Sequence, residues 1–480
     1  MKKILVAATA AVALATPALA FDVKWSGDLN NRFSYSTQAD LMRNTGLSGE
    51  GYNNTYVNLG DNISRPIDTQ KKSNDSDFFG EIKYRLTMTG TDDDKKVKGV
   101  VGFEFGANKF GASGADFAGD DNNFEFRWGY VDFEVPFDPA SHLIVGLQPA
   151  GYNKFLWSDN GGGVKWVSKR GKLGYSLGWF RDDLTNGGIG DSTTTTTALR
   201  FNDANNNGTV EAGELVNVTT TTQNTKSTND DVYAFDVTYT IDNGPKLNGF
   251  ALYREDGQES IAGVSGVQDK KLWLGLAGEG QAGALFYGFT GIYQTGELKV
   301  NNETLDREAY LLNAEVTYKF DKLRVKAGWL YSSGDDDATD DDVENFQNID
   351  AYMGGFGSVV VFDGLADDNS LVTSPYILDK GLNMPYIGVD YDLNDKASIG
   401  ASYLYIATAE DFDGSRDTDT SGDTELGHEI SVRASYKITK NLTTGIEAGY
   451  LIGGDVWDEL ASEGDGDDVI RTNANVRFTF

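Results

Sequence analysis

The chain has 480 residues, a formal net charge of −32 and no cysteine, and 39% of its residues are hydrophobic. Such an acidic chain has no basic patch to meet the phosphates of a nucleic acid, and without cysteine its fold cannot depend on disulfides. Beyond residue 20 the sequence contains no apolar stretch of the length that a membrane-spanning helix needs.

The first 20 residues have the pattern of a secretory signal peptide. Lys2 and Lys3 precede an apolar run over residues 4–15, and residues 17–20 supply the small side chains that a signal peptidase needs. The apolar run is shorter than the roughly 20 residues that span a bilayer as a helix. We therefore expect residues 1–20 to be cleaved and residues 21–480 to form the mature protein.

Many segments of the mature sequence alternate between apolar and polar residues. In residues 81–88, Ile82, Tyr84, Leu86 and Met88 alternate with polar side chains, and residues 310–320 and 468–480 repeat the pattern. This alternation predicts strands with one face in lipid and the other in water. Because strands cross a bilayer only when every backbone group is paired, we predict an all-β, transmembrane, antiparallel up-and-down β-barrel.

The connections between the predicted strands alternate between short and long. Eight short turns are predicted near residues 91, 137, 170, 242, 278, 320, 394 and 439, and nine long loops at residues 37–77, 110–122, 150–163, 184–230, 257–269, 297–307, 333–382, 410–426 and 454–467. They imply eighteen strands, with short periplasmic turns and long acidic extracellular loops. Alternation is weakest in residues 164–169 and 247–254, and merging one hairpin would leave sixteen strands.

Acidic runs concentrate in the predicted loops, for example at residues 335–344, 411–425 and 463–468. Such runs are typical of solvated loop tips that repel one another. The alternative is a surface that binds divalent cations, which can bridge it to lipopolysaccharide.

The predicted loop at residues 184–230 carries a motif over residues 203–214 that matches the twelve-residue calcium loop of an EF-hand. The candidate calcium ligands are Asp203, Asn205, Asn207, Thr209, Glu211 and Glu214. The flanks are β-branched threonine runs rather than helices, so the motif predicts a calcium-stiffened loop and not a calcium switch. An Asn-Gly-rich turn that binds nothing is the alternative.

Charged residues also stand at water-facing positions of the predicted strands, where a water-filled lumen would accept them. The predicted pore-lining residues on strands are Lys83, Arg85, Arg127, Arg254, Arg324, Lys326, Arg433, Arg471 and Arg477. We expect at least half of the water-facing charges to pair along the wall.

The third long loop begins at Pro149 and is short and aromatic. It is the best candidate to fold inward, with Lys154 and Asp159 facing the channel, and a capped hairpin at the rim is the alternative. No catalytic site is expected, because the only two histidines, His142 and His428, fall at opposite ends of the predicted barrel.

Several segments resemble a known family of membrane proteins. The cleavable leader, GYVDFEVP from Gly129, GLQP from Gly146, SDNGGGVKW from Ser158 and the terminal Phe480 are similar to the outer-membrane homotrimeric porins of sulfate-reducing-type bacteria. The resemblance covers roughly residues 78–180 and both ends, and it does not include the calcium-type loop.

This resemblance implies a homotrimer in the outer membrane of a Gram-negative bacterium, in contact with lipid and lipopolysaccharide. It also implies passive diffusion of small hydrophilic solutes and ions, with Lys154 and Asp159 at the constriction. The alternative function is a calcium-dependent surface adhesin or envelope-anchoring barrel without a conducting pore.

Overall fold

Most of the chain forms one large β-sheet. The computed structural model describes residues 21–37, 76–110, 124–181, 192–201, 215–224, 231–261, 264–300, 303–336, 342–362, 371–412, 423–456 and 468–480. Within these ranges one sheet has nineteen strands, and a second sheet is the hairpin of β8 (Ser192–Phe201) and β9 (Leu215–Asn224). Because β16 (Asp342–Val343) only adds two residues in parallel beside β14, eighteen strands form the wall.

The wall strands, in chain order, are β1 (Phe21–Ser36), β2 (Asp77–Asp92), β3 (Val97–Phe110), β4 (Phe124–Val135), β5 (Asp138–Pro149), β6 (Asn160–Arg170), β7 (Leu173–Arg181), β10 (Asp231–Thr240), β11 (Lys246–Ile261), β12 (Val264–Ala282), β13 (Leu285–Val300), β14 (Glu303–Phe320), β15 (Leu323–Ser332), β17 (Leu382–Asp392), β18 (Ala397–Phe412), β19 (Asp423–Lys437), β20 (Leu442–Gly453) and β21 (Val469–Thr479).

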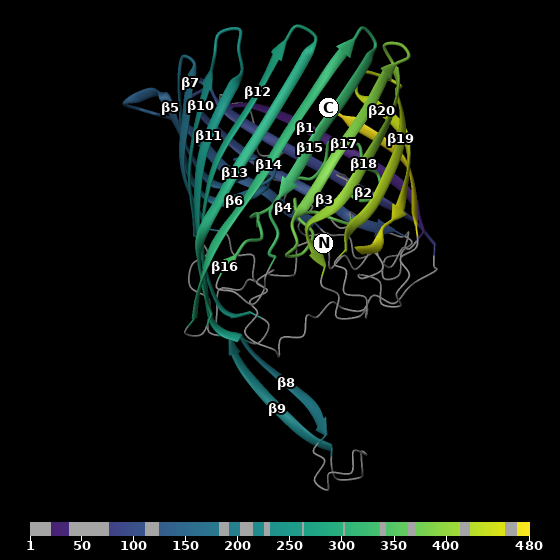
Figure 1. The fold of residues 1–480 in the computed structure, drawn as a ribbon. Coiled ribbons are helices and arrows are strands. Elements are labelled where there is room, and N and C mark those ends of the chain that lie inside the picture. Colours follow the sequence, from purple (N-terminus) through teal and green to yellow (C-terminus); the bar gives the residue numbers. More distant parts are fainter. Residues whose placement is uncertain are drawn as a thin grey trace, which may run out of the picture.

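Each wall strand pairs antiparallel with the next wall strand in the sequence (Figure 1). β7 pairs with β10 and β15 with β17, so the β8–β9 hairpin and β16 stand outside this order. The ring closes between the first and last strands, from Asp28 opposite Thr479 to Ser36 opposite Arg471. The structure confirms the eighteen-strand barrel, and because β6 and β11 are separate strands, the sixteen-strand alternative is wrong.

Apolar and polar residues alternate between the outside and the inside of the barrel. On β14, Tyr310, Leu312 and Val316 are 43%, 42% and 45% exposed on the outer surface, whereas Asn313 on the inner face is only 6% exposed. Lipid would cover the outer row, so its exposure without lipid is the expected property of a membrane barrel.

Each of the eight predicted short turns joins the two strands that the sequence assigned to it, but the turn predicted near residue 278 lies later in the structure, at Gly283. β12 continues through Gly278 and Gly280 to Ala282, and the chain reverses at Gly283, whose φ is 63°. A tight hairpin needs a positive φ at this position, which glycine adopts without strain.

Two predicted long loops, at residues 257–269 and 297–307, are mostly paired strand. β11 runs to Ile261 before β12 begins at Val264, and β13 runs to Val300 before β14 begins at Glu303. These four strands have 16 to 19 residues, against about 9–11 needed to cross a bilayer. Their polar ends pair through the backbone beyond the apolar band, where lipid no longer imposes alternation.

The predicted signal peptide at residues 1–20 and the calcium-type loop at residues 203–214 lie outside the described residues, as do most residues of the predicted loops at 37–77, 110–122 and 454–467. Helices long and apolar enough to cross a bilayer are absent from the part of the chain that the structure describes.

Candidate channel constriction

The segment between β5 and β6, residues 150–159, packs inside the barrel. Phe155, Leu156 and Trp157 are almost completely buried, and the Trp157 ring lies 5.1 Å from Phe180 on the inner face of β7 in an edge-to-face arrangement. The side-chain oxygen of Asn153 accepts a hydrogen bond from the Phe155 N–H, and the backbone carbonyl of Asn153 accepts one from the Trp157 N–H, each at 2.9 Å. The segment is therefore a compact turn whose apolar side faces the wall.

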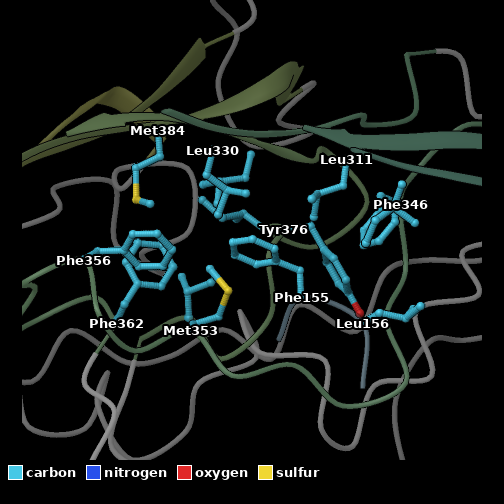
Figure 2. Packing of buried hydrophobic residues seen from close by; sticks show 14 of the residues in the cluster. Phe155, Leu156, Leu311, Leu330, Phe346, Met353, Phe356, Phe362, Tyr376 and Met384 are labelled. Atoms are coloured by element: carbon cyan, nitrogen blue, oxygen red, sulfur yellow. The ribbon is translucent and has the colours of Figure 1, made fainter. Parts of the chain in front are cut away.

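A second segment, between β15 and β17, also packs inside the barrel. Its described residues 342–362 and 371–381 contribute Phe346, Met353, Phe356, Phe362 and Tyr376 to a buried cluster. Figure 2 shows this cluster against the wall residues Leu311, Leu330 and Met384, which come from β14, β15 and β17. An apolar core inside a lumen removes these side chains from water, as in a soluble protein.

The two inward segments are joined by backbone hydrogen bonds. The N–H groups of Ile349 and Asp350 donate to the Leu156 carbonyl at 2.9 and 3.1 Å, and the Tyr352 N–H donates to the Lys154 carbonyl at 2.7 Å. The Phe155 and Phe356 rings are also stacked, with 6.4 Å between their centroids. The segments therefore form one body inside the barrel.

This body is also tied to the wall at β12 and β13. The Trp273 indole N–H lies 2.9 Å from the Gln347 carbonyl and 3.0 Å from the Gln294 side-chain oxygen, and that oxygen also accepts from the Gln347 N–H at 2.9 Å. All three residues are buried, so the contacts satisfy polar groups that water cannot reach.

A cluster of basic side chains lines the inner face of β2, β3 and β4. Glu104 lies 2.6 Å from Arg85, 2.6 Å from Arg127 and 3.5 Å from Lys83. We call these four residues the basic cluster; its three cations around one carboxylate leave a formal surplus of two positive charges, which Asp159 beside Arg127 partly offsets. Because the Arg85 side chain is 40% exposed, this surplus reaches the lumen.

The two predicted loop residues of the pore occupy different environments. Lys154 lies 4.6 Å from the Phe155 ring centroid and 5.0 Å from that of Phe356, and no carboxylate among the described residues is within 4 Å of its ammonium. Burial lowers the pKa of Lys154, while the charge of Glu315 opposes this shift. Asp159 is exposed and close enough to Arg127 to interact with it electrostatically.

Lys154 borders a cavity of about 790 Å³ on the inner face of β10 to β14. Its polar lining comes mainly from Asp236, Thr238, Asn248, Asn313, Glu315 and Thr317. The inward body and this wall therefore enclose a space that hydrated solutes can occupy.

Most other predicted pore-lining residues pair along the wall. Lys326 lies 3.0 Å from Glu315, Arg324 lies 2.6 Å from Asp392, Arg433 lies 2.7 Å from Asp390, and Arg477 donates to Asp28 at 2.8 Å. Arg254 and Arg471 are 7% and 0% exposed and so have little contact with the lumen solvent. The predicted pairing along the wall is confirmed for these four residues, whereas a role of any of them in conduction stays a prediction.

The metal site remains a prediction, because all six candidate ligands, from Asp203 to Glu214, are outside the described residues. Within the residues that are described, no group of three or more His, Asp or Glu side chains is arranged to hold a metal ion.

Sequence reasoning missed the inward packing of the segment between β15 and β17. The signal was present in residues 359–362, where the apolar run Val-Val-Val-Phe lies in a predicted extracellular loop that should have been polar. Glu429 on β19 was expected to face water like the other inward carboxylates, and its contact with this run was not predicted.

An apolar outer surface, a polar inner wall and a lumen narrowed by inward segments define an outer-membrane channel of the porin-like class. Such a barrel belongs in the outer membrane of a Gram-negative bacterium. Residues 209–465, more than half of the chain, match the family described as alginate export, and the chain belongs to this family.

Solved outer-membrane proteins share the fold at low sequence identity. OpdK of Pseudomonas aeruginosa is 12% identical with a TM-score of 0.52, and the alignment covers 96% of this chain and 98% of that one. OpdQ of the same organism is 13% identical with a TM-score of 0.51 and the same coverage. OpdO is 10% identical with a TM-score of 0.51, covering 96% and 97%. No curated protein matches the sequence.

Proposed function

We propose that this protein is a porin through which small hydrophilic solutes and ions diffuse passively, with a preference for anions. The observation that carries the proposal is the basic cluster, whose surplus charge lies at the lumen beside Asp159 and the inward body. Fixed positive charge at a narrow point raises the local concentration of anions.

Planar-bilayer recording tests this function directly. We expect discrete ohmic steps, and under a KCl gradient a reversal potential of the sign that chloride preference gives. A membrane that stays sealed would support the alternative of an adhesin or envelope-anchoring barrel. A potassium-selective channel would retain the porin and reject the anion preference.

The family match favours a second candidate, export of an acidic polysaccharide, because alginate export is the description of the matching family. A chain of carboxylated sugars would be attracted to the same basic cluster. Oligomeric uronates and neutral glucose oligomers of equal length separate the two candidates. Uronate oligomers that cross the membrane through the native channel and not through Arg85→Ala, with glucose oligomers excluded from both, would support export, whereas uronates that block the current without crossing would count against it.

The homotrimer that the resemblance implies is part of this proposal and is tested by chemical cross-linking in detergent. The sequence of residues 203–214 supports a further proposal, a loop stiffened by calcium. Calcium should protect this loop from protease in the native protein and should not do so in Glu214→Ala. Equal digestion with and without calcium would reject the site.

A further inference from the structure

One buried carboxylate on the lumen wall accepts hydrogen bonds from five donors. Glu429 on β19 is 0% exposed, and its oxygens accept from the N–H groups of Val359, Val360 and Val361 at 2.6, 3.1 and 3.0 Å. The hydroxyls of Ser358 and Ser431 each donate at 2.6 Å. Consecutive N–H groups that converge in this way form an anion-binding concavity.

Four of the donors belong to residues 355–362 of the second inward segment, which we call the strap, and the fifth, Ser431, lies on β19 itself. At the other end of the strap, the Lys326 ammonium donates to the Gly355 carbonyl at 3.2 Å and the Ser402 hydroxyl to the Gly357 carbonyl at 2.6 Å. The carbonyl end of the strap therefore meets donors on the wall, and its N–H end meets a carboxylate. The backbone carbonyls of the strap thus lie over hydrogen-bond donors of the wall, and its N–H groups lie over a negative charge.

The strap also packs closely on the wall through its apolar side chains. Val359 and Val360 are 4% and 0% exposed and lie over Gly449 on β20. A Cβ atom at residue 449 would be 2.9 Å from the Val359 Cβ and 2.8 Å from the Val360 Cγ2. The missing side chain at this glycine lets the strap lie directly against the wall.

We propose that Glu429 is a positioning residue that sets the width of the channel by holding the strap against β19. The inference rests on the proposed conducting function. Removing the carboxylate leaves three buried N–H groups without their acceptor, which is unfavourable until water reaches them. Because Phe356 in the strap stacks on Phe155, release of the strap also loosens residues 150–159.

Single-channel conductance and hydrogen exchange test the proposal together. In Glu429→Ala we expect higher conductance, more open-channel noise and faster amide exchange in residues 355–362. Glu447→Ala is the matched control, because Glu447 lies at an inward-facing position of the adjacent strand and the side-chain contact shown for it is with Asn473 at 3.4 Å. The control should leave open-channel noise and amide exchange in residues 355–362 at the native values.

A disulfide can restore the attachment of the strap to the wall that Glu429→Ala removes. The chain has no cysteine, so Val359→Cys with Gly449→Cys introduces the single possible pair. The two Cβ positions are 2.9 Å apart, and a shift of under about 1 Å reaches disulfide geometry. In the Glu429→Ala background, oxidation should return conductance to the native value and reductant should raise it again.

A folded Glu429→Ala barrel with native conductance and native exchange in the strap would overturn the proposal. If the alanine variant does not fold, Glu429→Gln keeps the side-chain volume and is measured in the same way. If the native protein does not conduct at all, the proposed function fails, while hydrogen exchange still decides whether Glu429 holds the strap.

Discussion

Removal of two arginines from the basic cluster should reduce the preference for anions. The double variant Arg85→Ala, Arg127→Ala leaves Lys83 opposite Glu104, so the formal charge of the cluster falls from +2 to 0. Both arginines are bound to Glu104, and no other cation takes their place in the variant.

The size of the effect follows from Coulomb's law. A unit charge roughly 7 Å from a passing ion in water changes its energy by about 0.6 kcal/mol, and salt at about 0.1 M reduces this to about 0.3 kcal/mol. Each lost charge disfavours the anion and favours the cation, so two charges change the selectivity by about 1.2 kcal/mol. The anion-to-cation permeability ratio should therefore fall by about sevenfold.

Reversal potentials under a KCl gradient measure this ratio. Lys270→Ala is the control, because Lys270 is paired with Glu255 and alternates with the inward-facing Lys271. An unchanged ratio in the double variant, or an equal change in the control, would refute the assignment of selectivity to the basic cluster.

Three further predictions concern the inward body and its supports. Phe155→Ala removes a fully buried side chain and should destabilise the packing of the inward body by about 3 kcal/mol. Conductance should rise, and the amide hydrogens of residues 349–352 should exchange faster. Because burial lowers the pKa of Lys154, this side chain should lose its positive charge at a lower pH than an ordinary lysine does. Over that pH range the anion preference should fall in the native channel and should not fall in Lys154→Met. Arg307 binds Asp269 through two hydrogen bonds at 2.7 and 2.9 Å and is buried, so Arg307→Met should destabilise the barrel by about 3 kcal/mol in urea unfolding followed by tryptophan fluorescence. The double variant with Asp269→Asn should lose less than the sum of the single variants, and an additive loss would contradict the pairing.

The wall of the barrel could be predicted from the sequence because lipid and water impose opposite requirements on alternate residues. Tyr310, Leu312 and Val316 followed this rule and are exposed on the outer surface. The rule failed where the strands leave the membrane, as in β11 to β14, since backbone pairing there tolerates any polar side chain. It also misplaced the turn before Gly283, because Gly278 and Gly280 are equally compatible with a turn in the sequence.

The inward body could be predicted only in part. The aromatic residues of the loop after Pro149 indicated a buried surface, and Phe155 and Trp157 are buried. The partners of this loop are nearly 200 residues later in the chain, at Ile349 and Asp350, and a periodic pattern contains no information on which loops meet. Glu429 was indistinguishable from the other inward-facing carboxylates, because its role depends on the three N–H groups that approach it.

The backbone hydrogen bonds between residues 349–352 and 154–156 have a consequence for biogenesis. The earlier loop precedes its partner by nearly 200 residues, so its aromatic side chains have no complete packing site until residues 349–352 have also entered the barrel. Closure of the ring and completion of the narrow passage should then occur in the same late step. An assembly intermediate arrested before that step would have neither a closed wall nor a narrowed lumen, so insertion of the last strands completes both.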